Sequence, residues 1–185
     1  VFPVVTSASK SVVCYDRSDE ESVKKTVKLF VEDVERVTGK RLELKEKMPS
    51  GKDIILVGMI GKNKYINQLV AQGRLDISPI KNGWEQYVIT IINNPFAGVG
   101  KALVIAGCDR RGTSYGLFSV SEAIGVSPWY WWADAPVARK KELRLQVNTI
   151  VSKEPSVKYR GIFINDEDWG LKPWASKVFE PETGD

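Results

Sequence analysis

The residues best suited to chemistry lie near the carboxyl end of the sequence, in the run KYRGIFINDEDWGLKPW at residues 158–174. An amide, three carboxylates and two indoles follow one another there, and such groups contact sugars in proteins. They are Asn165, Asp166, Glu167, Asp168, Trp169 and Trp174. We predict that they form part of a carbohydrate-binding pocket. On local sequence alone, an ordinary solvated acidic turn is the alternative interpretation.

The run RGIFI at residues 160–164 comes directly before these polar groups and is typical of a short buried strand. Acids at the carboxyl end of a strand are typical of sugar sites on β/α barrels. Only residues 171–185 follow, too few for the seven further strand–helix units that a barrel needs. We therefore expect the first strand and loop of a (β/α)8 barrel that is otherwise missing. Inverting hydrolysis needs carboxylates about 6.5–9.5 Å apart, so at least one partner must come from outside this loop.

The run VSPWYWWA at residues 126–133 contains four consecutive aromatic rings. They belong to Trp129, Tyr130, Trp131 and Trp132. Aromatic rings serve as sugar-stacking platforms or bury area between domains. Consecutive side chains in an extended segment point to opposite sides, so one ligand cannot stack on all four rings. We therefore favour a domain seam formed by Trp129, Trp131 and Trp132. An autonomous carbohydrate-binding module that uses the same run is the alternative.

A glycine-containing turn, DRRGTSYG at residues 109–116, lies between a predicted strand and a predicted helix. Glycines before a helix can cradle a phosphate, which would suggest a regulatory nucleotide-binding domain. The spacing is not GxGxxG, however, and no Gly-Lys-Ser/Thr follows. We favour a structural role in which Gly112 and Gly116 let the helix lie close to the sheet. Asp109 would then fix the turn or pair with an arginine.

The pattern of apolar residues predicts an α/β (α+β) domain with about three helices packed on a mixed sheet. The predicted strands lie at residues 12–15, 41–45, 53–58, 84–92, 102–106 and 143–150, and the helices between Ser18 and Gly39, at residues 63–73 and at residues 113–124. Ser18 and Glu21 resemble a capping box. The short connection between residues 41–45 and 53–58 predicts a hairpin. The polar joint at residues 152–156 divides an N-terminal domain, 1–154, from the barrel start, 155–185.

Composition excludes several classes of function. The 185 residues are 43% apolar and 27% charged, with a formal net charge of +4, and the basic residues are scattered, so we expect no nucleic-acid partner. No apolar run is long enough to span a membrane. The chain has no histidine and only two cysteines, Cys14 and Cys108, which we expect to be buried free thiols. The acidic run lacks the spacing of an EF-hand. We therefore expect no metal and no cofactor.

Three of these segments together resemble the N-terminal region of glycoside hydrolase family 115. They are DRRGTSYG at residues 109–116, SPWYWWAD at 127–134 and the run at 161–174. The resemblance implies a non-catalytic α/β domain beside a (β/α)8 barrel that removes glucuronic acid, or its 4-O-methyl ether, from xylan with inversion. It also implies further domains, absent here, through which full-length members dimerise. The main catalytic acid and base would lie beyond residue 185.

On this resemblance, the partners are glucuronoxylan or glucuronosyl-xylooligosaccharides and the rest of the same polypeptide. We expect residues 158–164 to be barrel strand 1, with the acidic run on the catalytic face and in contact with the sugar. Because the chain ends at Asp185, we expect it to be inactive by itself. The polymeric substrate implies a periplasmic or extracellular location.

Overall fold

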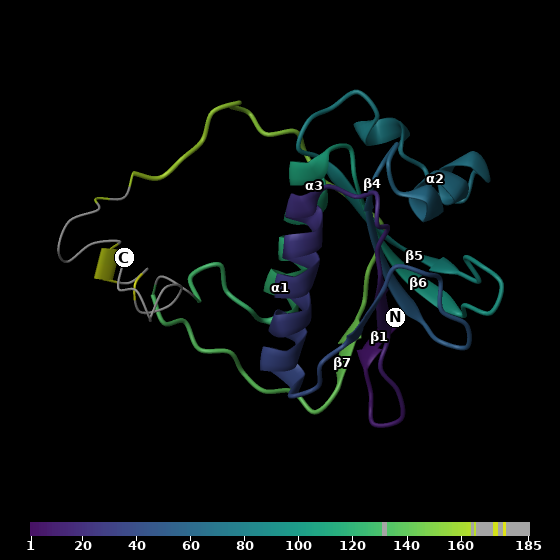
Figure 1. Ribbon diagram of the computed structural model, residues 1–185, viewed down its shortest axis with the longest axis horizontal. Helices are drawn as coiled ribbons and strands as arrows, with labels where there is room; N and C mark the ends of the chain where they lie inside the picture. Colours follow the sequence, from purple (N-terminus) through teal and green to yellow (C-terminus); the bar gives the residue numbers. More distant parts are fainter. Residues whose placement is uncertain (131–132, 164, 166–171, 174–175, 177–185) are drawn as a thin grey trace. The chain divides into compact units, whose positions relative to one another are not determined.

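The computed structural model describes residues 1–130, 133–163, 165, 172–173 and 176 (Figure 1). The chain divides into two compact units, Val1–Pro155 and Ser156–Asp185. Every named helix and strand lies in the first unit. In chain order these are β1 (Phe2–Val5), β2 (Val12–Cys14), α1 (Glu21–Thr38), β3 (Glu43–Lys45), β4 (Ile54–Met59), α2 (Lys64–Ala71), η1 (Ser78–Ile80), β5 (Tyr87–Asn93), β6 (Lys101–Gly107), α3 (Arg110–Ile124), β7 (Leu143–Leu145) and β8 (Ile150–Val151).

The main sheet has six strands in the order β3-β2-β4-β6-β5-β8. The first four are parallel, whereas β5 runs antiparallel to both of its neighbours. The sheet is therefore mixed, as predicted, but the predicted hairpin is wrong. Strand β2 lies between β3 and β4 and pairs in parallel with both. The reason is composition, because the fully apolar β2 suits a central position, whereas β3, with Glu43 and Lys45 exposed, suits an edge.

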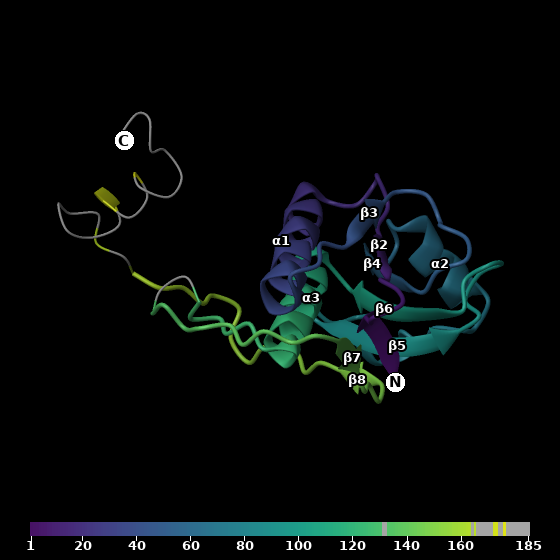
Figure 2. The same ribbon diagram turned by 90° about the horizontal axis from the view of Figure 1, so that it is seen from below.

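Helices cover both faces of the sheet (Figures 1 and 2). One core lies on the side of α1 and α3 and includes Phe30 and Leu117, both buried. The other lies on the side of α2 and includes Ile66 and Leu69. Alternate residues of the central strands feed the two cores, as the twofold side-chain period of a strand requires. No helix in the described part of the chain has the length and apolarity needed to cross a bilayer.

The ends of α1 agree only in part with the sequence. The helix ends at Gly39, whose φ of 72° is left-handed, as its sequence position predicted. The predicted capping box is wrong. The helix begins at Glu21, and the Ser18 hydroxyl donates instead to Asp16 Oδ1 at 2.9 Å and to the Lys62 carbonyl at 3.1 Å. Ser18 therefore joins two loops and does not cap the helix.

The strand predicted at residues 143–150 is divided between two sheets. Strand β7 pairs antiparallel with β1 in a separate two-stranded sheet, and β8 pairs antiparallel with β5. Leu143 and Leu145 are buried in the core beside α1 and α3, whereas Ile150 and Val151 are 46% and 41% exposed. This one segment of alternating apolar and polar residues thus forms two short strands. Its first half pairs with the buried β1, and its second half pairs with β5 at the edge of the main sheet.

The buried strand predicted at residues 158–164 is not confirmed by the part of it that the structure describes. Residues 158–163 have no strand, and Ile164 lies outside the described residues. Tyr159, Ile162 and Phe163 are 88%, 77% and 90% exposed. A strand requires a neighbour to accept and donate its main-chain hydrogen bonds, and residues 158–163 pair with no strand of the described chain.

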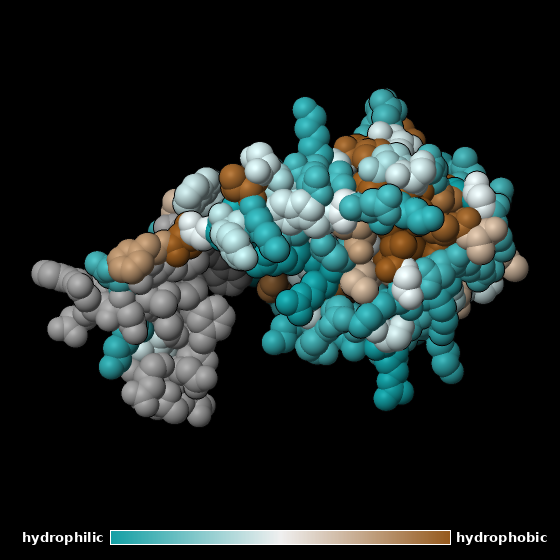
Figure 3. All heavy atoms as spheres, turned by 90° about the horizontal axis from the view of Figure 1, so that it is seen from above, coloured by the Kyte–Doolittle hydropathy of each residue, from teal (hydrophilic) through white to brown (hydrophobic). Residues whose placement is uncertain are grey.

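The outer surfaces of α1 and α3 carry exposed apolar side chains in addition to charged ones. Leu29 on α1 and Tyr115 and Phe118 on α3 are 36–45% exposed. Figure 3 shows one face of the molecule, on which hydrophilic side chains predominate and apolar ones gather in patches. Single exposed apolar residues are normal on soluble domains, so their exposure alone does not identify a binding surface.

Two glycines of α3 set its distance from the sheet, as predicted. A Cβ at residue 112 would lie 2.2 Å from the Gln86 carbonyl oxygen, and one at residue 116 would lie 2.8 Å from Ile105 Cγ2. Gly112 therefore faces a backbone atom that cannot rotate away, whereas Gly116 faces a side chain.

We expect Gly112→Ala to lower the free energy of unfolding by about 2 kcal/mol or more, because the added methyl group has no space beside the backbone of residue 86. Urea denaturation followed by circular dichroism measures the change. Gly161→Ala is the control, since a Cβ there meets nothing within 4 Å. Equal stability of the Gly112 variant and the wild type would contradict the close contact.

Candidate functional site

The predicted sugar-contact residues fall almost entirely outside the described part of the chain. Asn165 is described and exposed. The structure does not describe Asp166, Glu167, Asp168, Trp169 and Trp174. Their role in sugar binding, and the barrel strand expected before them, therefore stay predictions.

The aromatic run begins as a turn that follows α3. The main-chain N–H of Trp129 donates to Ser127 Oγ at 3.1 Å, and that of Tyr130 donates to the Ser127 carbonyl at 3.0 Å. The Trp129 side chain is 64% exposed, whereas Tyr130 packs against the core on the α1 side. Neighbouring rings thus point in different directions, which limits any single ligand to part of the run. Trp131 and Trp132 lie outside the described residues.

Tyr130 is held by a contact with α1. The guanidinium carbon of Arg36 lies 4.9 Å from the centre of the Tyr130 ring, within the range of a cation–π interaction. Arg36 also donates to Asp33 Oδ1 at 2.8 Å, and Asp33 is buried. These contacts hold the turn that contains Tyr130 against α1, and the exposed Trp129 belongs to the same turn.

The start of α3 has the structural role that the sequence favoured, and not that of a phosphate cradle. Asp109 caps the helix, because its Oδ1 accepts from the Gly112 N–H at 2.7 Å. Its Oδ2 accepts from the Glu85 N–H at 2.7 Å. Arg111 pairs with the buried Glu85 at 2.7 Å. The Gly112 N–H, which would donate to a phosphate in a phosphate-binding turn, is thus already bonded to Asp109.

A buried polar network closes the carboxyl edge of the sheet, next to the ends of β2 and β4. The fully buried Asn63 amide donates to Asp19 Oδ2 at 2.8 Å and to the Val57 carbonyl at 3.0 Å. Its oxygen accepts from the N–H groups of Tyr65 and Ile66 at the start of α2. In open α/β sheets this edge is the usual ligand site, but here it is filled by the protein's own side chains.

Two carboxyl groups of this network have opposite pKa shifts. Burial raises the pKa of Asp19, although three donors favour its charged form. Burial also disfavours the charged form of Asp16, but hydrogen bonds from Ser18 and Lys64 outweigh it, so the pKa of Asp16 lies below its usual value. The hydrogen bonds that both carboxyl groups accept from the surrounding loops and from the start of α2 give them a structural role.

Neither thiol is suited to nucleophilic chemistry. Both cysteines are free, which confirms the prediction, with Cys14 buried and Cys108 half-buried. Burial raises the pKa of Cys14 to about 12 and also raises that of Cys108. A thiol in that state is uncharged at neutral pH and unreactive. Among the described residues, no cluster of histidine, cysteine or acidic side chains could hold a metal ion.

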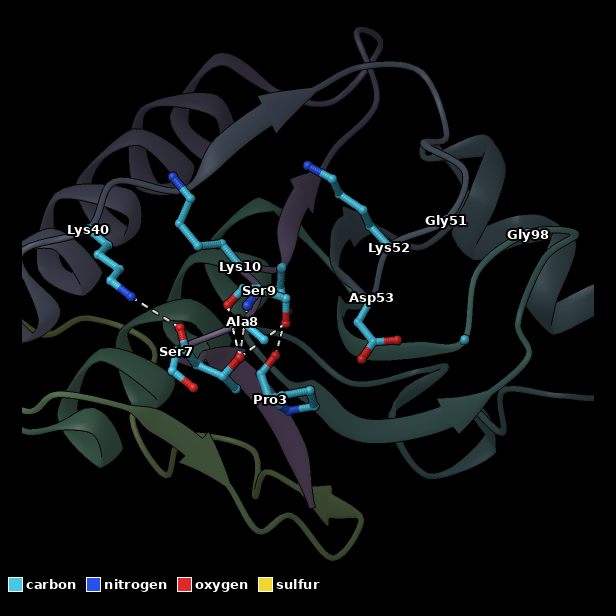
Figure 4. A pocket seen from close by; sticks show the side chains of 13 residues that line it. Pro3, Ser7, Ala8, Ser9, Lys10, Lys40, Gly51, Lys52, Asp53 and Gly98 are labelled. Atoms are coloured by element: carbon cyan, nitrogen blue, oxygen red, sulfur yellow. Dashed lines mark hydrogen bonds between the residues drawn. The ribbon is translucent and has the colours of Figure 1, made fainter.

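An open hollow of about 740 Å³ lies at the opposite, amino edge of the parallel strands (Figure 4). It is lined by residues that come just before β2, β4 and β6 and by the turn between β1 and β2. Cationic and hydroxyl side chains are prominent in it, namely Lys10, Lys40, Lys52, Thr6, Ser7, Ser9 and Ser11. Two smaller hollows share lining residues with it. One shares Lys10 and Lys52, and the other shares Gly98 and Gly100. We call these three hollows together the amino-end groove.

Neither the polar network nor the amino-end groove was predicted from the sequence. The network was signalled by Asp16 and Asp19 after a buried strand and by Asn63 before a helix, a typical N-cap. The groove was signalled only by short turns rich in serine, lysine and glycine at residues 7–11, 50–53 and 97–101. Such turns are common in loops, so their meeting at one edge follows only from the parallel pairing of the strands.

Comparison with known proteins identifies the family. The family model for Glycosyl hydrolase family 115 matches residues 152–185. A solved structure, described as a novel family GH115 4-O-methyl-α-glucuronidase, BtGH115A, with specificity for decorated arabinogalactans, is 35% identical with a TM-score of 0.76 over 98% of this chain. The chain belongs to glycoside hydrolase family 115.

Within family 115, the chain corresponds to a limited part of a longer protein, since it spans 22% of the length of BtGH115A. The three helices and the mixed sheet are consistent with an N-terminal domain of the family. A second solved structure, that of CpGH84D, is 13% identical with a TM-score of 0.45, over 62% of this chain and 17% of that one. A search of curated proteins found no match.

The opposite pKa shifts of Asp16 and Asp19 predict opposite pH dependences. The carboxylate of Asp16 stabilises the fold above its usual pKa of 3.8, and this stabilisation is lost as the pH falls through its lower folded-state pKa. The stability advantage of the wild type over Asp16→Asn should therefore shrink as the pH is lowered from about 7 to about 3. Urea denaturation across this range measures it.

Asp19→Asn is the matched comparison. Because the folded-state pKa of Asp19 is raised, ionisation of that group weakens the fold as the pH rises through this pKa. The wild type should therefore lose stability relative to Asp19→Asn as the pH rises. If the stability differences between the wild type and each of the two variants changed in the same direction with pH, the opposite pKa shifts assigned to Asp16 and Asp19 would be wrong.

Proposed function

We propose that this chain is the N-terminal, non-catalytic domain of a glycoside hydrolase that removes glucuronic acid, or its 4-O-methyl ether, from a decorated plant polysaccharide with inversion. The observation that carries the proposal is the similarity to a 4-O-methyl-α-glucuronidase along 98% of the chain at 35% identity. The substrate predicted from the sequence is glucuronoxylan. The specificity of BtGH115A adds decorated arabinogalactan as a second candidate polymer.

The arrangement of carboxylates supports a scaffold role. Asp19 and Asp16 are enclosed in the buried network, and Asp109 and Glu85 are bound at the start of α3. In the amino-end groove, Asp53 accepts from the Lys101 N–H at 2.8 Å. Inverting hydrolysis requires one carboxyl to protonate the leaving oxygen and another to activate water on the opposite face of the sugar. These carboxylates are instead committed to partners within the fold.

The acidic run at residues 165–168, with Trp169 and Trp174, remains the proposed sugar-contacting part of the chain. The family match at residues 152–185 includes all of these residues and supports their placement in the catalytic part of the parent protein. The exposed Tyr115, Phe118 and Trp129 would then contact the remainder of the polypeptide. We also propose a periplasmic or extracellular location, because the substrate is a polymer.

The 185-residue chain alone should release no glucuronic acid, whereas the parent polypeptide should. We would incubate each protein with glucuronoxylan and with glucuronate-decorated arabinogalactan, and measure free glucuronic acid. Proton NMR at early times should show the β-anomer, as inversion of an α-linkage requires. Release by a clean preparation of the chain alone would overturn the scaffold proposal. Absence of release by the parent from both polymers would overturn the hydrolase proposal.

The 64% exposure of Trp129 favours a second candidate function, an autonomous carbohydrate-binding module. A module of this kind predicts that oligosaccharides change the tryptophan fluorescence of the chain in a saturable way. Trp129→Ala should then weaken binding about tenfold, in line with the contribution of one stacked ring. Trp84→Ala, which removes an indole outside the aromatic run, is the control. Unchanged affinity of the Trp129 variant would exclude Trp129 as the stacking ring, and absence of any saturable change in the wild type would exclude the module and leave the seam.

A further inference from the structure

The amino-end groove is built from parts of the chain that are distant in sequence. The turn at residues 6–11 forms one side, and the loops at residues 51–53 and 98–100 form the other. The adjoining hollows extend it to Arg41 and Glu43 beside β3 and to Asn94 and Phe96 beside the turn between β5 and β6.

The charges of the groove are unbalanced in favour of cations. Lys10, Lys40 and Lys52 line it together with two carboxylates, Asp53 and Glu43. Arg41 also lies at the groove, but it pairs with Glu35 at 2.6 Å. Asp53 is bound to a main-chain N–H. Glu43 lies 2.6 Å from Lys45 and 3.9 Å from Lys52. The carboxylates of the groove are therefore already occupied.

The lysines retain donors for a ligand. Lys10 Nζ donates to the Arg41 carbonyl at 3.0 Å, and Lys40 Nζ donates to the Thr6 carbonyl at 3.1 Å. An ammonium group has three N–H donors, so these bonds position each side chain and leave two donors unused. Neither lysine forms an ion pair with a carboxylate among the described residues. Figure 4 shows Lys10 and Lys52 extending in the same direction from two different loops.

The neutral part of the lining suits sugar hydroxyls. Ser7 and Ser9 are exposed and bring hydroxyl groups to the hollow, beside the exposed Gly51, Gly98 and Gly100. The hydroxyls of Thr6 and Ser11 are buried and donate to the Ser9 and Pro3 carbonyls, so they shape the turn. Hydroxyls both donate and accept, which matches the hydroxyls of a glycan better than the oxygens of a phosphate, which only accept. The combination of ammonium and hydroxyl groups therefore favours a ligand that carries both carboxylates and hydroxyls.

We propose that the amino-end groove binds a uronate-bearing glycan, with Lys10, Lys40 and Lys52 at its carboxylates and the Ser7 and Ser9 hydroxyls at its ring hydroxyls. The groove would hold the decorated polymer at a site separate from the acidic run at residues 165–168. This inference rests on the proposed function, which supplies a glucuronate-bearing substrate. It differs from the module based on Trp129, because it places the sugar at the amino edge of the sheet.

The test is a calorimetric titration of the 185-residue chain with glucuronosyl-xylooligosaccharides at low salt. The same oligosaccharides with their carboxyl groups reduced to alcohols are the ligand control. We expect saturable binding that weakens about tenfold on carboxyl reduction and weakens further with added salt, because exposed charges are screened. Lys10→Gln with Lys52→Gln should weaken binding about five- to tenfold, the effect of losing two exposed charge contacts.

Lys25→Gln with Lys28→Gln is the matched protein control, since it removes the same charge from exposed positions on α1. It should change affinity less than about twofold. Absence of binding, an equal loss in the control variant, or equally tight binding of polyglutamate would overturn the proposal. Failure of the proposed function is a separate outcome, because it is judged by release of glucuronic acid by the parent polypeptide.

Discussion

The fold depends on one fully buried amide. Asn63 uses both of its donors and both acceptor positions of its oxygen, so its hydrogen-bonding capacity is complete. These bonds join the loop after β2, the end of β4 and the first turn of α2. Gly58 makes the arrangement feasible, because a Cβ at that residue would lie 2.3 Å from the Asn63 Nδ2. A single polar side chain thus connects the sheet to both the loop that leads to α1 and the helix on its other face.

This constraint explains why the two edges of the sheet differ. The carboxyl edge is closed by Asp16, Asp19 and Asn63, and farther along by Asp109, and each of these groups has partners within the domain. The amino edge, as formed by the described residues, is hollow. In open α/β sheets ligands usually bind at the carboxyl edge. In this domain the hollow with room for a ligand lies at the opposite edge, where lysine and serine side chains line it.

Much of the fold could be predicted because apolar spacing reports burial directly. The helical face from Val23 to Val34, the left-handed Gly39 and the close packing of Gly112 all followed from local sequence. Strand order did not, because a short connection between two strands does not reveal that a third strand, β2, lies between them. The segment 158–163 has the apolar composition of a strand, but composition cannot supply the partner strand, which must come from elsewhere. For the site, Trp129 could be singled out from composition, whereas the groove depends on strand pairing between distant residues.

The two edge strands of the sheet have a consequence for the behaviour of the protein in solution. An unpaired strand edge is a template for aggregation, and proteins protect such edges with charge or by keeping them short. Strand β3 has three residues, and Glu43 and Lys45 on it form an ion pair at 2.6 Å. Strand β8 has only two residues. The β3 end of the sheet is therefore a poor template for strand addition. At the other end β8 pairs with only two of the seven residues of β5, so the rest of β5 is the part of the sheet most open to an added strand.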